Sequence, residues 1–436
     1  MTYPRFGVIR QQFEKTTPLD TPQMVIAELN RTSLLSRIRE GDSVLITAGS
    51  RGITAMNDVL RTCVAAVKER GGRPFLYPAM GSHGSGTAAG QAEVLRHLGV
   101  MESSIGAPVH TLLDMVEIDR IDGAIPVYVD KAAAAADHIL IVNRIKEHTE
   151  YIGDTESGIL KMAVVGLGRQ LGAQTMHQLA VNISYYKAIH MIAGALFRNL
   201  KVLGAVALLE DHHNQLRRVE AIRPRDVFSR EPELLEESKL YKPKLPFENL
   251  DILLIDEIGK EISGSGMDTK VVGRIMNVYE KECESPKITR IVVRDLSETT
   301  DGNATGIGLA DFTTQRAAEK INFEATVTNC LTAVAPEKGR TPLAFPSDRE
   351  AMDAAFRTIG LWTPEKVRIA WIANTKDLEF MAVSTALMSE SGSGFETCRD
   401  YGSFELPYDN AGNLPHLRDC LQTEGSAKDE VKHVKP

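Results

Sequence analysis

Short apolar runs alternate along this chain with longer segments in which apolar residues recur every three or four positions. The clearest runs are residues 43–48, 74–79, 138–142 and 202–210, and they predict buried strands. The segment 54–69 has the spacing of a helix that buries one face. Strands that alternate with helices in this way are typical of a parallel, doubly wound α/β sheet.

A second set of strand patterns follows a proline-rich, charged stretch at residues 223–249. Such stretches often connect domains, and a new buried run begins at residue 250. We therefore expect two α/β domains, residues 1–245 and 246–436, with doubly wound, mainly parallel sheets and a cleft between them. The charged residues after Pro415 are expected to fray.

Composition narrows the class of protein. The chain has 436 residues, 43% of them apolar, which is enough for two real cores. Its net charge of -8 comes from mixed signs without a basic stripe, so we expect no nucleic acid partner. No run approaches the roughly 18 apolar residues of a membrane span, and the first residues lack a secretory pattern, so we expect a cytoplasmic protein that does not bind membranes.

Polar residues follow three of the predicted strands. Arg51 follows residues 43–48, His83 lies in the glycine-rich loop after residues 74–79, and the turn from Arg144 to His148 follows residues 138–142. The carboxyl ends of parallel strands share one edge, where open α/β sheets bind ligands. These side chains are therefore expected to share one crevice, although a histidine between glycines is also common in a solvated loop.

Lys161 interrupts the apolar run ILKMAVV. A lysine in such a run must reach water, bind an anion or lose its charge, and an uncharged lysine is a nucleophile. Gly166, Gly168 and Gly172 then lead into a helical stretch with His177 near its start. The segment 143–177 is therefore interpreted as the floor of an active site, whose glycines let the backbone approach a bound group.

Taken in order, Arg51, His83, His148, Lys161 and His177 resemble the site residues of the nickel-dependent lactate racemase family. The intervals from His83 to His148 and from Lys161 to His177 are close to that family's pattern. The resemblance covers about the first 180 residues, and beyond residue 245 it is limited to general architecture.

This resemblance implies a racemase or epimerase of a 2-hydroxy acid that works by hydride transfer. It implies a covalently attached nickel pincer nucleotide, pyridinium-3,5-bisthiocarboxylic acid mononucleotide with nickel, bonded to Lys161 and bound through its metal by His177. His83 and His148 would be the acid/base pair, and Arg51 would bind the substrate carboxylate. Maturation would require the cofactor-synthesis enzymes as partners.

Two departures from the family pattern lie near the expected substrate. The stretch EHTEYIGDTESGILK is longer than in members near lactate racemase and adds four acidic residues: Glu147, Glu150, Asp154 and Glu156. The loop GSHGSG also lacks the arginine-proline pair that would follow the histidine. We expect both changes to line the substrate side, which favours a larger or more polar 2-hydroxy acid than lactate.

Three other classes remain open. An NAD-dependent oxidoreductase is suggested by AVVGLGRQLG, if it joins a strand to a helix, although its spacing is G-x-G-x-x-x-G and no acid follows at the usual distance. A zinc hydrolase would use His83, His148 and His177 but gives Lys161 no role. A ligand-binding module without catalysis is the third. The turn Gly302–Gly308 has the composition of a phosphate-binding loop.

Overall fold

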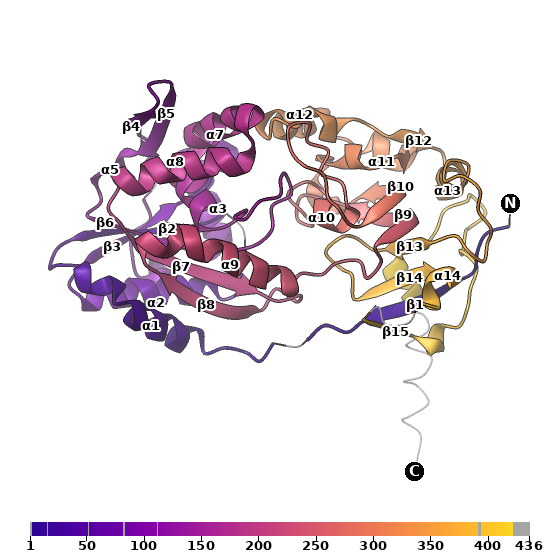
Figure 1. The fold of residues 1–436 in the computed structure, drawn as a ribbon, viewed down its shortest axis with the longest axis horizontal. Coiled ribbons are helices and arrows are strands. Elements are labelled where there is room, and N and C mark those ends of the chain that lie inside the picture. Colours follow the sequence, from indigo (N-terminus) through magenta and orange to yellow (C-terminus); the bar gives the residue numbers. More distant parts are fainter. Residues whose placement is uncertain are drawn as a thin grey trace, which may run out of the picture. The chain divides into compact units, whose positions relative to one another are not determined.

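The structure is a computed structural model that describes residues 2–14, 16–50, 52–81, 83–110, 112–390 and 394–421 (Figure 1). The chain divides into two compact units. The N-terminal unit is Lys15–Lys242, and the C-terminal unit joins Met1–Glu14 to Pro243–Pro436. Both units are α/β with mainly parallel sheets, so the predicted fold class is confirmed.

The predicted first domain started at residue 1, whereas the first strand belongs to the C-terminal unit. Strand β1 (Phe6–Gln11) pairs antiparallel with β14 (Phe380–Ser384). Strand β1 therefore joins a sheet whose other strands all come from the second half of the chain, for example through the pairing of Phe6 with Ser384.

The sheet of the N-terminal unit has the order β3-β2-β6-β7-β8. Its strands are β2 (Ser43–Ala48), β3 (Arg73–Pro78), β6 (His138–Arg144), β7 (Val202–Glu210) and β8 (Leu216–Ile222). The first four in that order are parallel, and β8 returns antiparallel to β7. Because β3 lies on one side of β2 and β6 on the other, the topological switch point of the sheet is between β2 and β6.

Helices cover both faces of this sheet (Figure 1). On one face, Val44 and Ile46 of β2 belong to the same apolar cluster as Val25 of α1 (Thr21–Thr32) and Val59 of α2 (Met56–Glu69). Figure 1 shows α7 and α8 on the other side, packed against each other. The other elements of the unit have these bounds: α3 (Ala88–His97), α4 (Glu102–Ile105), β4 (Met115–Ile121), β5 (Ile125–Asp130), α5 (Lys131–Ala135), α6 (Ile159–Lys161), α7 (Arg169–Ile183), α8 (Tyr185–Asn199) and α9 (Val227–Leu240).

The predicted strands of this unit are confirmed, but the run ILKMAVV is helical. It forms α6 and continues into a π-helical turn, η3 (Met162–Leu167). A dinucleotide fingerprint needs a strand before its glycines, so AVVGLGRQLG does not have the required setting. The helical stretch that contains His177 ends at Ser184, whose φ is 85°, and a second helix, α8, follows directly.

The sheet of the C-terminal unit has the order β12-β11-β10-β9-β13-β14-β1-β15. It is parallel from β12 to β13 and antiparallel beyond. Leu253 and Ile255 of β9 belong to one apolar cluster and Ile252 and Leu254 to another, so both faces are covered. The remaining bounds are β9 (Asn249–Ile258), β10 (Lys287–Leu296), β11 (Phe312–Thr314), β12 (Leu343–Phe345), β13 (Ile369–Ile372), β15 (Phe395–Thr397), α10 (Thr269–Val272), α11 (Gln315–Glu319), α12 (Phe323–Thr332), α13 (Asp348–Phe356) and α14 (Thr385–Met388).

The turn Gly302–Gly308 has a different role from the phosphate binding that its composition suggested. A Cβ atom on Gly306 would overlap the carbonyl oxygen of Ser265, and one on Gly308 would overlap that of Glu337. These glycines therefore let the unit pack closely against its own backbone.

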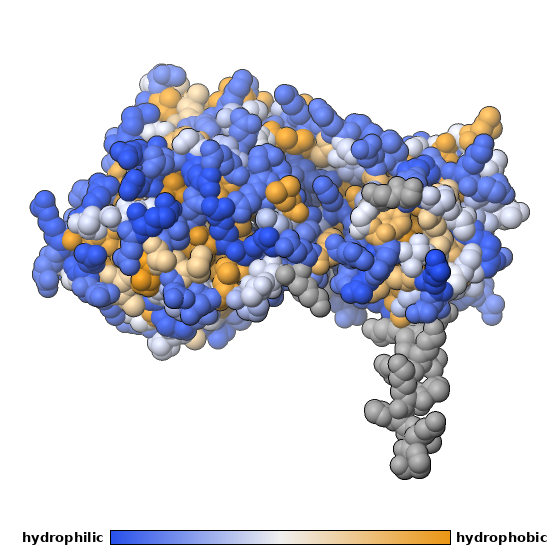
Figure 2. Space-filling model, turned by 60° about the horizontal axis from the view of Figure 1, so that its bottom comes forward, coloured by the Kyte–Doolittle hydropathy of each residue, from blue (hydrophilic) through white to orange (hydrophobic). Residues whose placement is uncertain are grey.

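Hydrophilic residues cover most of the face shown in Figure 2, and hydrophobic residues lie there in small separate patches. Small patches of this kind are normal on a protein surface. Every helix within the described part of the chain is too short or too polar to cross a lipid bilayer.

Candidate active site

Three adjacent parallel strands bring the loops of His83 and His148 to one edge of the N-terminal sheet. Strand β2 pairs with β3 on one side and β6 on the other, so their carboxyl ends lie together. Arg51, which follows β2, lies outside the described residues. His83, after β3, begins a short 3-10 turn and its side chain is exposed. His148 follows β6 and is half-buried.

Lys161 and His148 are in direct contact. The Nζ atom of Lys161, the last residue of α6, lies 2.6 Å from Nε2 of His148. On the other side of the imidazole ring, Nδ1 accepts the backbone N–H of Glu150 at 3.1 Å. The loop after β6 thus holds His148 against the lysine that sequence reasoning selected.

A buried tyrosine brings His177 to the same place. Tyr185 is 1% exposed, and its ring centroid lies 6.0 Å from that of His148 and 5.6 Å from that of His177. Tyr151 stacks on the Tyr185 ring with an interplanar angle of 2°. The prediction that His177 lies near the start of its helix is wrong, because it sits midway along α7. Sequence reasoning missed Tyr185, which the chain break at Ser184 places at the first position of α8.

The glycines between Lys161 and His177 approach protein atoms, which corrects the expectation that they approach a bound group. A Cβ atom on Gly166 would lie 2.9 Å from Cβ of Ala79, just after β3. One on Gly168 would lie 3.1 Å from the carbonyl oxygen of Tyr128 in β5. These contacts pack η3 and the residue after it against two other elements. Turns of π-helix often occur at functional sites.

A buried glutamate fixes the start of α6. Glu231 of α9 has no exposed surface, and its Oε2 accepts the N–H of Leu160 at 2.9 Å. Burial raises the pKa of Glu231 to about 8, and the N–H groups of Leu160 and Ile159 lower it only in part. Its Oε1 occupies the space beside Gly158, where a Cβ atom would overlap it. Nothing in the sequence distinguishes Glu231 from the other acidic residues of α9, and sequence reasoning missed it.

Arg169, which begins α7, also holds the loop that leads to His83. Its guanidinium lies 4.1 Å from the ring centroid of Tyr77, and its Nε donates to the Tyr77 hydroxyl at 2.7 Å. A second nitrogen donates to the side-chain oxygen of Gln91. The Gln91 amide in turn donates to the carbonyl oxygens of Met80 and Gly81, at 3.1 and 3.0 Å. The helix of His177 and the loop of His83 are therefore fixed by one buried network.

The acidic residues of the long loop are engaged within the N-terminal unit. Glu147 forms an ion pair with Lys242 at 3.0 Å. Glu156 is 1% exposed and accepts the backbone N–H of His148 at 2.6 Å. Burial and the adjacent Asp154 carboxylate raise the pKa of Tyr186. We expected these carboxylates to line the substrate side, and their internal partners mean that they no longer argue for a more polar substrate.

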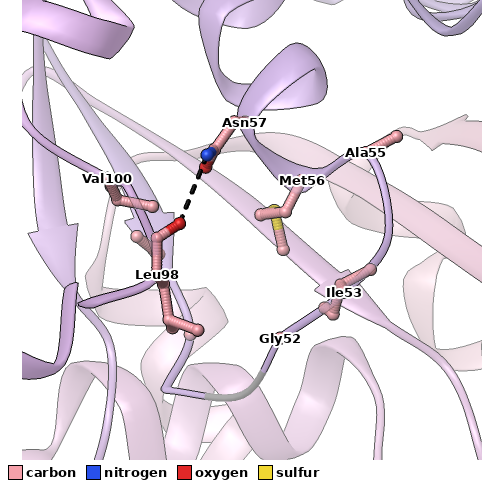
Figure 3. Close-up of a pocket in the computed structure, with 9 residues that line it drawn as sticks. Gly52, Ile53, Ala55, Met56, Asn57, Leu98 and Val100 are labelled. Atoms are coloured by element: carbon pink, nitrogen blue, oxygen red, sulfur yellow. Dashed lines mark hydrogen bonds between the residues drawn. The ribbon is translucent and has the colours of Figure 1, made fainter. Parts of the chain in front are cut away.

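A small pocket of about 130 Å³ lies where β2 ends (Figure 3). Its lining is apolar apart from Asn57, whose side chain donates to the carbonyl oxygen of Leu98 at 3.2 Å. Gly49 forms one edge, and a Cβ atom there would lie 3.4 Å from Cε of Met162, the neighbour of Lys161. Pockets for drug-sized ligands are usually about 300 to 1,000 Å³, so this one suits a small group only.

A protein-only metal cluster is not found among the residues that the structure describes: no three His, Cys, Asp or Glu side chains gather as ligands. The zinc arrangement of His83, His148 and His177 is therefore not formed here.

Comparison with known proteins finds a similarity in fold to a solved structure. No protein-family model matches the chain, and no curated protein matches its sequence. The solved structure of the lactate racemase apoprotein from Thermoanaerobacterium thermosaccharolyticum matches with a TM-score of 0.50 and 12% sequence identity, covering 85% of this chain and 84% of that one. At this identity the match shows the fold alone: the chain has a fold similar to that of lactate racemase along most of its length.

Proposed function

We propose that the protein is a racemase or epimerase of a small 2-hydroxy acid that uses a lysine-tethered nickel pincer nucleotide. The observation that supports this most is the grouping of Lys161, His148 and His177 around Tyr185. That group lies with the loops at the switch point of the sheet, where open α/β sheets bind ligands. The similarity in fold to the lactate racemase apoprotein is compatible with this activity.

The residues present fit the proposed cofactor. Lys161 and His177 are both partly exposed residues, and both belong to the helical stretch from α6 to α7. Lys161 would hold the cofactor through its amine, and His177 would bind nickel, for which imidazole is a suitable ligand. When bound, the cofactor supplies the hydride acceptor and donor.

The protein's own residues would bind the substrate and handle its proton. Arg51 would bind the carboxylate through its planar guanidinium. His83 and His148 would exchange the hydroxyl proton, and they come from strands on either side of the one that leads to Arg51. We keep a 2-hydroxy acid other than lactate as the expected substrate, because the loop around His83 differs from the family pattern.

The cofactor part of the proposal is tested with protein produced together with the cofactor-synthesis enzymes. Intact mass spectrometry should show a covalent increment on the wild type, and Lys161→Ala should abolish it. His177→Ala should keep the increment and lose nickel. A wild-type protein with neither increment nor nickel would contradict the assignment.

The reaction is tested with a panel of single-enantiomer 2-hydroxy acids, including lactate, followed by chiral chromatography. We expect inversion of one of them, and a loss of about 100- to 10,000-fold in His83→Ala and in His148→Ala. Substrate deuterated at the carbinol carbon should keep its deuterium, because hydride transfer does not exchange it with solvent. Rapid loss of deuterium would favour an enolising isomerase, and reduction of NAD would favour the dehydrogenase.

A further inference from the structure

The position of the proton on His148 follows from what its ring nitrogens touch. Nδ1 accepts the backbone N–H of Glu150 at 3.1 Å. A backbone amide nitrogen can only donate, so Nδ1 carries no proton while this bond holds. A neutral imidazole has one N–H group, which must then be at Nε2, and the doubly protonated ring is excluded.

The same reasoning determines the state of Lys161. Its Nζ lies 2.6 Å from Nε2 of His148, which is a hydrogen-bond distance. A lysine ammonium has three donors and no acceptor, so it cannot bond to a ring nitrogen that also carries a proton. An uncharged amine has a lone pair that accepts the Nε2–H group.

We propose that the folded protein, before any cofactor binds, holds His148 as a neutral imidazole protonated only at Nε2 and Lys161 as an uncharged amine. The backbone N–H of Glu150 fixes the first state, and the Nε2–H group of His148 stabilises the second. The half-buried setting favours both, because burial disfavours a charge on either side chain.

Two charged residues, Glu156 and Lys239, lie on the elements packed beside the pair and partly balance each other. Glu156 is the carboxylate beside His148, and its Oε2 is taken up by the His148 backbone N–H. On α9, burial opposes the charge of Lys239, but a hydrogen bond to Glu236 and the charges of Glu156 and Glu147 raise its pKa overall. The negative charge of Glu156 is therefore close to the positive charge of Lys239, which partly cancels its effect on the His148 imidazole. The rings nearest the imidazole are those of Tyr151 and Tyr185.

The proton placement gives the two histidines unequal roles, and this consequence rests on the proposed function. With one enantiomer of the substrate, His148 would donate a hydrogen bond from Nε2 to the substrate oxygen while His83, from the loop after β3, removes the hydroxyl proton. A neutral histidine that acts as a donor is a known way to polarise a carbonyl group. An uncharged Lys161 is also the form of an amine that attacks an electrophilic carbon.

Nitrogen NMR on the cofactor-free protein tests the state of His148 directly. With ¹⁵N-labelled histidine, and with His148→Gln used to assign the signals, we expect a protonated Nε2 and an unprotonated Nδ1. This pattern should not change around pH 6.5, where an ordinary histidine titrates. A doubly protonated His148 near neutral pH, or a proton on Nδ1, would overturn the proposal.

Competitive acylation with limiting acetic anhydride tests Lys161. An ordinary ammonium must first lose its proton, so its acylation rate rises about tenfold per pH unit, whatever its accessibility. Lys131, whose side chain is 61% exposed, is the reference in the same digest. We expect a nearly flat rate for Lys161 above neutral pH and a steep one for Lys131. Equal slopes would contradict an uncharged Lys161.

A matched pair of variants tests the cause. Glu150→Ala keeps the backbone N–H and should leave the His148 nitrogen spectrum and the Lys161 acylation profile unchanged. Glu150→Pro removes that donor, so the proton of His148 should no longer be confined to Nε2. His148→Phe should give Lys161 the slope of an ordinary lysine. If Glu150→Pro does not fold, the nitrogen NMR spectrum of the wild-type protein still tests the proposed proton placement on His148. None of these measurements uses the cofactor, so their failure would leave the proposed reaction standing, and failure of that reaction would not alter them.

Discussion

The buried carboxyl group of Glu231 gives a prediction about stability that needs no assumption about function. It has no exposed surface, and burial raises its pKa from 4.5 to about 8. The folded protein therefore keeps Glu231 neutral at neutral pH. Glu231→Gln has nearly the same shape, keeps an acceptor oxygen for the N–H of Leu160, and cannot titrate.

The sign follows from which state binds the proton. Above about pH 4.5 the unfolded chain loses the Glu231 proton, whereas the folded chain keeps it up to about pH 8. In this window the unfolded state binds fewer protons, so the free energy of unfolding falls by about 1.4 kcal/mol per pH unit. The stabilisation that Glu231 contributes is fully present below its unfolded-state pKa of 4.5 and is lost as the pH rises toward about 8. Between about pH 6 and pH 8 the free energy of unfolding of the wild type should fall by roughly 3 kcal/mol relative to that of Glu231→Gln.

The assay is denaturant unfolding of both proteins at several pH values, followed by far-ultraviolet circular dichroism. Glu233→Gln is the control, because this glutamate is on the same helix with its side chain 64% exposed. Both tryptophans, Trp362 and Trp371, lie in the C-terminal unit, so their fluorescence reports separately on that unit. Hydrogen exchange of peptides that contain Leu160 gives a local measurement. If wild type and Glu231→Gln show parallel pH dependence, Glu231 is not held neutral and the reasoning is refuted.

Three other substitutions test the packing of the two units. Arg169→Met should destabilise the N-terminal unit by about 3–5 kcal/mol, because the buried carboxylate of Asp130 loses its arginine partner at 3.6 Å, and should speed hydrogen exchange in the loop of His83. Gly166→Ala should cost about 1–3 kcal/mol in thermal unfolding, because the new Cβ would lie 2.9 Å from the Cβ of Ala79, which can move only with its backbone, whereas Gly194→Ala, with its nearest neighbour at 3.5 Å, should be neutral or stabilising. Asp348→Ala should lower the tryptophan-detected stability of the C-terminal unit by about 3–5 kcal/mol, because Arg294 loses a buried partner at 2.8 Å.

The strands could be predicted because their apolar runs are short, continuous and bounded by turn residues. Residues 43–48 form β2 as expected, and the runs at 138–142 and 202–210 are the cores of β6 and β7. The shared edge of β2, β3 and β6 followed from the rule that such units form parallel sheets. That rule also placed the loops of His83 and His148 together without any alignment.

The run ILKMAVV shows where the pattern fails. A short apolar run fits a buried strand and a buried helix equally well, and length alone did not separate them. Tertiary contacts stabilise the segment as a helix. Glu231 caps its start, and Gly166 and Gly168, which lack side chains, let Ala79 and Tyr128 approach closely. These partners lie far away in the sequence, so no local signal identifies them. The pairing of β1 with β14 was missed for the same reason.

The placement of Lys161 depends on residues that carry no chemistry of their own. A lysine side chain has four rotatable bonds, so its amine is held in place only if its backbone is fixed and its end has a partner. Here Glu231 fixes the start of the helical segment, Arg169 begins the helix that follows it, and His148 holds the amine. Glu231 lies on α9, Arg169 donates to Tyr77 of β3, and His148 lies in the loop after β6. The geometry of the site is therefore sensitive to substitutions such as Glu231→Leu or Arg169→Met, which leave all five of the predicted site residues unchanged.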